Sequence, residues 1–325
     1  MSDLDLDDLI NACREGNIQK VKELIKSGVD INITNKYGEN ALEVSMEEGN
    51  LELVKLLIKA GVDVAGKDTG TTALIIASSD GYTEIVKLLI AAGVDVNITN
   101  SHGRNPLSYA AEYGNADIVK LLITLGADVN KSSDGGGTTG LMEASGHTDQ
   151  YGIGQWVRAS GHTDVIKLLL EAGADPNIQS NYGHTALINA VYENNEPEII
   201  ELLIKAGADP NVQDKEGVTA LLEAARHNNH AVIKLLIESG ADPTIKANDG
   251  KAPIGYPVVH YDIYPFYIVS KVKKLHAKQR LAFATMFIDR EHDDKPDDII
   301  IQILEALKIP VTVNKSLLDK TNELL

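Results

Sequence analysis

A pentapeptide that begins with glycine recurs along most of the chain. It reads GVDIN at its first copy and GADPN at its fifth and sixth copies. The seven copies begin at residues 28, 61, 93, 126, 173, 207 and 240. Five of the six intervals lie within one residue of 33, and the interval from 126 to 173 is 47. A fixed period in this range predicts a stack of similar structural repeats rather than one globular core.

Each period predicts two helices joined by a tight turn. The first helix begins with a Thr or Asn, whose side-chain oxygen can accept a backbone N–H that has no partner inside the helix. We expect such caps at Thr72, Asn105, Thr185 and Thr219. The second helix, as in residues 83–93, carries a broad apolar stripe. The glycine that follows ends it, because Gly adopts the left-handed backbone at least cost.

These T/N-x-L-x-x-A and G-A-D-x-N motifs resemble those of the ankyrin repeat family. The resemblance covers about residues 5–250 in seven helix pairs. It implies an all-α solenoid of helix–turn–helix–hairpin units, with a concave face that family members use to bind partners. Residues 1–32 form the expected N-terminal cap, because a terminal repeat needs a polar outer face. An eighth unit starts at Asn248 but fails at Pro257, so we place the solenoid at residues 1–251.

The long interval predicts an insertion of 13–15 residues in the fifth unit, at about residues 145–160. ASGHTD stands on both sides of it, at 144–149 and again at 159–164. This duplication fits either a natural local event or an engineered scaffold with a deliberate insert. The segment holds Tyr151, Trp156 and Arg158, a combination typical of binding hot spots. We expect either a finger that contacts a partner, or a segment that folds back onto the solenoid through Trp156 or forms a disordered bulge.

Residues 252–325 differ in composition from the repeats and match no family that we recognise. They begin with an aromatic-rich stretch, YPVVHYDIYPFYIV, and continue with three expected helices. We expect a short, mostly helical cap or a small domain. The first of these helices carries a basic face between Lys271 and Arg280, which could touch nucleic acid or an anionic membrane. The favoured alternative is a solvated face that pairs with acidic residues 291–298 or with the acidic solenoid.

The charge and the cysteine content narrow the class of partner. The net charge is −17 and the sequence pI is about 4.9, which disfavours nucleic acid and favours a protein partner with a basic surface. Cys13 is the only cysteine, so no internal disulfide can form. The N-terminus lacks a signal peptide and no long apolar run is present, so we expect a cytoplasmic protein without a membrane span. Delivery into a host cell stays open, and a monomer is favoured.

The sequence shows no common catalytic motif. The sequence contains no G-x-S-x-G, H-E-x-x-H or phosphate-loop pattern, so we expect no enzyme, no cofactor and no metal site. His162 stands where the family uses a His to bridge backbone groups at the helix junction.

We predict a scaffold or adaptor that binds a protein through the concave face and the inserted finger. The alternative is an effector or regulatory protein whose C-terminal region carries the activity and whose repeats deliver it. The residues predicted to contact a partner are Tyr37, Glu47, His102, Glu112, Tyr113, Tyr151, Trp156, Arg158, Tyr182, Tyr192, Lys215 and Arg226.

Overall fold

The computed structural model describes the chain outside residues 1–2, 36, 65–68, 147–161, 194–195 and 254–325. The chain divides into two compact parts, an N-terminal part, Met1–Tyr182, and a C-terminal part, Gly183–Leu325. The described residues form fourteen helices and no strand, which confirms the all-α prediction. The helices follow one another in pairs, and each pair is called a repeat below. The N-terminal part contains repeats 1–5, and the C-terminal part contains repeats 6 and 7.

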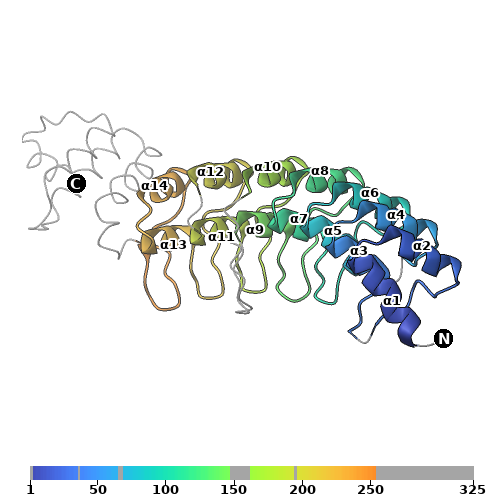
Figure 1. The fold of residues 1–325 in the computed structure, drawn as a ribbon. Helices are drawn as coiled ribbons and strands as arrows, with labels where there is room; N and C mark the ends of the chain where they lie inside the picture. The colour runs from blue at the N-terminus through green and yellow to red at the C-terminus, as the bar shows by residue number, and fades with distance from the viewer. Residues whose placement is uncertain (1–2, 36, 65–68, 147–161, 194–195, 254–325) are drawn as a thin grey trace, which may run out of the picture. The chain divides into compact units, whose positions relative to one another are not determined.

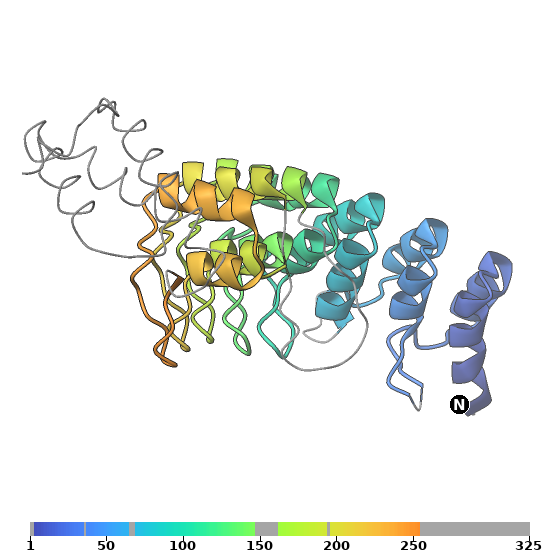
Figure 2. The same cartoon turned by 90° about the vertical axis from the view of Figure 1, so that its left-hand side faces the viewer.

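The first helices of the repeats are α1 (Asp3–Arg14), α3 (Ala41–Glu47), α5 (Thr69–Ser79), α7 (Pro106–Glu112), α9 (Gly140–Ser145), α11 (Ala186–Tyr192) and α13 (Ala220–Arg226). The second helices are α2 (Ile18–Lys26), α4 (Leu51–Lys59), α6 (Thr83–Ala91), α8 (Ala116–Thr124), α10 (Thr163–Glu171), α12 (Pro197–Lys205) and α14 (His230–Glu238). Within the N-terminal part the first helices pack in one row and the second helices in another (Figure 1). Loops between successive repeats extend away from the row of first helices, as the turned view shows (Figure 2).

Side-chain caps start most of the first helices. Asn105 accepts a hydrogen bond from the backbone N–H of Ser108, and Thr185 and Thr219 cap α11 and α13 in the same way. These three predicted caps are confirmed. The cap predicted at Thr72 is wrong, because α5 begins at Thr69 and runs through that residue. Asn105 is the equivalent of Thr72 and α7 begins directly after it, so α5 begins four residues earlier in its repeat than α7 does.

The second helices form much of the core, and they do so through one repeated triplet. In α8 the buried residues are Ile118, Val119 and Leu122, all exposed by 1% or less. The same three positions are buried in α4, α6, α10 and α12. Each such side chain stabilises the fold by about 1.5–3 kcal/mol relative to an exposed one. The apolar stripe predicted from the sequence therefore faces the row of first helices.

The D-x-N motif joins one repeat to the next. The side-chain oxygen of Asn97 accepts the N–H of Asp128 at 2.8 Å, and its amide donates to the carbonyl of Gly126 at 3.2 Å. Asn130 makes the same pair of bonds to Asp175 and to Gly173, across the interval of 47 residues. The junction between repeats is therefore unchanged where the sequence period is broken.

The extra residues lie between the two helices of repeat 5. In repeat 4, the residue before the second helix, Asn115, donates its backbone N–H to the carbonyl of Ala110, five positions earlier. In repeat 5, His162 makes the equivalent bond to Ala144 at 3.1 Å, eighteen positions earlier. Both ends of the insertion therefore return to the positions they would have in an ordinary repeat. The inserted residues themselves, 147–161, lie outside the described residues.

Candidate functional site

The C-terminal ends of the first helices present one row of exposed side chains. Glu48, Asp80 and Tyr113 are equivalent, because each follows or ends its helix and donates its backbone N–H to the carbonyl four residues earlier. All three side chains belong to exposed residues, and Tyr113 is 44% exposed. Among the described residues, neither Glu48 nor Asp80 makes an ion pair. We call Glu48, Asp80 and Tyr113 the cap row; it spans repeats 2, 3 and 4 of the N-terminal part.

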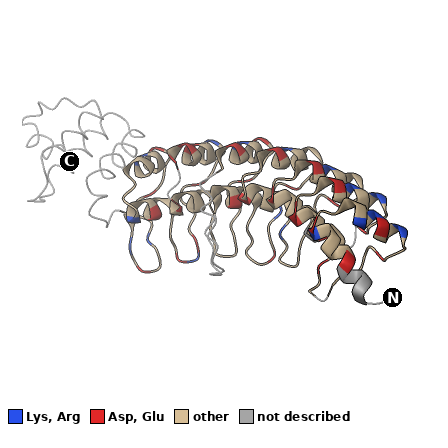
Figure 3. Ribbon diagram, in the orientation of Figure 1, with Lys and Arg blue, Asp and Glu red and all other residues tan. Residues whose placement is uncertain are grey.

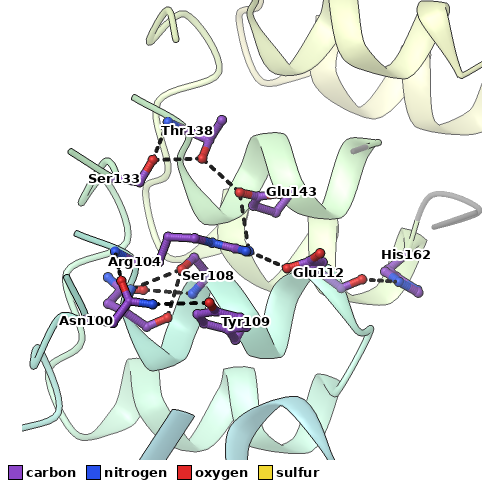
Figure 4. Close-up of polar contacts among 10 residues, drawn as sticks. Asn100, Arg104, Ser108, Tyr109, Glu112, Ser133, Thr138, Glu143 and His162 are labelled. Atoms are coloured by element: carbon purple, nitrogen blue, oxygen red, sulfur yellow. Dashed lines mark hydrogen bonds and ion pairs between the residues drawn. The ribbon is translucent and has the colours of Figure 1, made fainter. Parts of the chain in front are cut away.

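A buried ionic network lies between repeats 4 and 5 (Figure 4), and one of its members, Glu112, directly precedes Tyr113 of the cap row in the sequence. Its centre is Arg104, which comes from the loop before α7. The guanidinium pairs with Glu112 at the end of α7 and lies 3.5 Å from a carboxylate oxygen of Glu143 on α9. It also stacks on Tyr109, with 4.0 Å between the guanidinium carbon and the ring centroid. The hydroxyl of Thr138 donates to Glu143 at 2.8 Å.

This network holds one positive and two negative charges away from water. The side chains of Arg104, Glu112 and Glu143 are 19%, 13% and 3% exposed. Burial alone would lower the pKa of Arg104, but the charges of Glu143 and Glu112 outweigh it and raise that pKa. The guanidinium is therefore held firmly charged, while the network keeps an excess of negative charge.

Tyr113 lies within the field of this network. Its pKa is raised, first because the side chain is partly buried and then because Glu112 and Asp80 are negative nearby. The phenol therefore stays neutral and can donate a hydrogen bond. An exposed, neutral aromatic ring with carboxylates on two sides suits a cationic group.

His162, which directly precedes α10, contacts the end of α7 in this region. Its ring lies at 2.9 Å from the backbone carbonyl of Glu112, and a Cβ added to Gly114 would meet the ring at 2.4 Å. Gly114 has a φ of +72°, so a side chain there would also strain the backbone. Of the bridge predicted for this histidine, the ring makes one contact, to the backbone carbonyl of Glu112 in the preceding repeat. The neighbouring repeat thus fixes the residue at which the insertion ends.

A second group of exposed side chains lies in the C-terminal part, on α11 and α13. The rings of Tyr192 and His227 meet edge to face, with 6.4 Å between their centroids. The buried carboxylate of Glu223 pairs with Arg226 at 2.9 Å and with His227 at 3.1 Å. Tyr192 is 50% exposed. This part therefore also offers an exposed tyrosine beside charged groups on its first helices.

A comparison with protein families identifies the repeats. The family described as ankyrin repeats (3 copies) matches residues 9–100, 62–133, 85–151 and 154–247. The chain belongs to the ankyrin repeat family. A search of curated proteins finds no match. Ankyrin repeats are, in general, modules that bind other proteins.

Three further features of the described part of this ankyrin repeat protein concern metal binding, membrane crossing and thiol chemistry. No group of three or more His, Cys, Asp or Glu side chains there could hold a metal ion. No described helix is both long and apolar enough to cross a membrane. The one cysteine, Cys13, is buried in α1, and burial raises the pKa of its thiol.

The predicted contact residues fall into three groups. Those in exposed positions are Tyr37, Glu47, His102, Tyr113, Tyr192, Lys215 and Arg226. Two are more covered: Tyr182 is half-buried, and the carboxylate of Glu112 pairs with Arg104. Tyr151, Trp156 and Arg158 lie outside the described residues. Of the exposed set, Tyr37, Tyr113 and Tyr192 are also among the few exposed large hydrophobic side chains.

Sequence reasoning missed the network beneath the exposed residues. Arg104 and Glu143 were not expected to take part in a site. Glu143 does carry a signal, because it is a charged residue inside the otherwise apolar T-G-L-M-E-A stretch of a first helix. A charge in such a position predicts a buried partner, since an unpaired one would be costly. The sequence does not say which of the surrounding cations is that partner.

Proposed function

We propose that this ankyrin repeat protein is a scaffold or adaptor that captures a protein partner through the first helices and hairpin loops of each of its two parts. The exposed tyrosines carry the proposal. Tyr113 and Tyr192 stand at the ends of first helices and Tyr37 in a hairpin loop, and they are 44%, 50% and 75% exposed. Tyrosine supplies a large contact area at low entropic cost, and it is enriched at interface hot spots.

A matched substitution tests this proposal. We expect Tyr113→Ala and Tyr192→Ala together to remove partners that the native chain captures from an extract of its own cells. The control is Leu125→Ala, because Leu125 is also 44% exposed and also caps a helix, but a second helix, α8. Captured proteins would be identified by mass spectrometry, and circular dichroism would show that each variant is folded. The same proteins captured by native chain and double variant would refute the assignment of this face.

We also propose that residues 1–251 form the repeat domain and residues 252–325 a separate cap or small domain. A chain that ends at 251 keeps all fourteen described helices. If it captures the same partners as the full chain, the repeats are sufficient for binding. Loss of capture would instead favour the alternative in which the C-terminal region carries the activity. The single cysteine and the membership in a family of binding modules support a reducing, cytoplasmic location and a non-enzymatic role.

A further inference from the structure

The two rows of helices in the N-terminal part differ in charge. First helices α3, α5, α7 and α9 contain no Lys or Arg. Each of the second helices α2, α4, α6, α8 and α10 contains at least one Lys. In Figure 3 the blue segments accordingly gather on second helices such as α2 and α4. Arg14 at the end of α1 is the exception in the row of first helices, and α5 has no charged residue, so this row carries fewer cations than the row of second helices.

The side chains of the cap row are available to a ligand. Glu48 and Asp80 make no ion pair among the described residues, whereas Glu84 on α6 pairs with Lys87 at 2.6 Å. Tyr113 follows in the same row. The arrangement next to it already binds a cation: the chain's own Arg104 stacks on Tyr109 and pairs with two carboxylates. Tyr113 offers a second ring beside the same excess negative charge, and this ring is open to solvent.

The spacing between the members of the cap row indicates which backbone conformation a matching ligand has. Helices packed side by side lie about 8–10 Å apart, so Glu48, Asp80 and Tyr113 follow one another at about that interval. A polyproline II chain advances about 3.1 Å per residue and has three residues per turn. Every third side chain of such a chain therefore lies on one face, about 9 Å from the next. A cationic side chain at each third position would meet the three members of the cap row in turn.

We propose that the cap row of repeats 2–4 binds an extended basic segment of a partner protein, with Lys or Arg at every third residue. The first two cations pair with Glu48 and Asp80, and the third lies over the ring of Tyr113 beside Glu112. This assignment rests on the proposed function, and it adds the chemistry and the register of the segment.

The test uses two synthetic peptides of identical composition with the full-length protein. One peptide is Lys-Pro-Pro-Lys-Pro-Pro-Lys, and the other is Lys-Lys-Lys-Pro-Pro-Pro-Pro. Both carry the same fluorophore, and binding is followed by fluorescence anisotropy at low salt, where exposed charges interact most strongly. We expect the spaced peptide to bind more tightly than the clustered one. Equal affinity for both would overturn the proposed register.

Protein variants locate the contacts. Glu48→Gln with Asp80→Asn should weaken the spaced peptide about two- to fivefold for each carboxylate removed. The control, Glu84→Gln with Asp117→Asn, removes the same number of charges from the starts of the second helices α6 and α8 in repeats 3 and 4, and it should leave affinity nearly unchanged. An equal loss in both pairs would mean attraction by overall charge only and would overturn the proposal.

The aromatic contact has its own pair of variants. Tyr113→Phe keeps the ring and should keep the affinity, whereas Tyr113→Ala should lower it. An unchanged affinity in Tyr113→Ala would overturn the third contact of the proposal. If neither peptide binds while the tyrosine variants still lose their cellular partners, the basic-segment proposal fails and the proposed function stands.

Discussion

Removal of the guanidinium at the centre of the buried network should cost much more than removal of either carboxylate. In Arg104→Met the side chain keeps much of its volume, but Glu112 and Glu143 lose their common cation. Breaking a buried pair from one side costs about 3–5 kcal/mol when the remaining charge cannot reach water. Because the side chains of Arg104 and Glu112 are 19% and 13% exposed, the lower end applies, and we expect about 3 kcal/mol.

Substitution of Glu143 provides the matched comparison. In Glu143→Gln the amide oxygen can still accept the hydrogen bond from Thr138, and Arg104 keeps its pair with Glu112. The variant also removes one of two negative charges. We expect a cost of about 1 kcal/mol, typical of one altered hydrogen bond. The free energy of unfolding of both variants would be measured by urea titration with circular dichroism at 222 nm.

The pH dependence separates an electrostatic cost from a packing cost. In Arg104→Met the buried carboxyl of Glu143 has lost its cation, so its folded-state pKa rises above the unfolded value of about 4.3. A group of this kind stabilises fully below its unfolded pKa, and the benefit is lost as pH rises through the folded pKa. The deficit relative to the native chain should therefore shrink between pH 7.5 and pH 5. A deficit below about 1 kcal/mol at pH 7.5, or one that pH does not change, would refute this reasoning.

Three further outcomes are expected. Gly114→Ala should destabilise the fold by more than Gly126→Ala, because both glycines have positive φ but only the first has a ring in the way of a Cβ; the left-handed strain alone costs about 1–2 kcal/mol, and urea titration of both variants gives the difference. The thiol of Cys13 is buried and its pKa is raised, so in the native protein it should react with a thiol reagent about a hundredfold or more slowly than in the chain unfolded by urea. Fast labelling of the native protein would contradict its burial. Deletion of residues 147–159 should leave a stable chain, whereas deletion of residues 145–159 should destabilise it, as thermal unfolding of the two would show.

The repeats were predictable because the same local interactions recur in each one. A Thr or Asn starts most first helices, a triplet of apolar residues buries each second helix, and a glycine ends it. Each of these rules acts over a few residues, so the sequence shows it directly. The cap predicted at Thr72 fails because α5 begins four residues earlier in its repeat than α7 does, so the cap motif alone does not determine where the helix starts. The motif alone did not contain this information.

The site was predictable only at its surface. Tyr113 and Tyr192 could be assigned to exposed helix ends from their place in the repeat, and both are exposed. The network below them joins Arg104 to Glu143, which belong to different repeats. Nothing in the periodic pattern specifies such a pair, because the two residues stand at different positions of their repeats. The pattern alone predicts that Glu112 is exposed, whereas the hydrogen bond from Arg104 places its carboxylate in the buried network.

The stack tolerates the insertion because a backbone hydrogen bond closes the connection between the two helices of a repeat both with and without the inserted residues. The backbone bond between His162 and Ala144 closes a loop of eighteen positions, where Asn115 and Ala110 close a loop of five. Closure entropy grows only with the logarithm of loop length, so the longer loop costs about 1 kcal/mol more. Burial of one core triplet stabilises by several times that amount. Before the insertion, Glu143 forms an ion pair with Arg104 of the preceding repeat. After it, the ring of His162 lies at hydrogen-bond distance from the carbonyl of Glu112. Repeat 4 thus fixes both ends of the insertion, so its sequence can vary without loss of the stack.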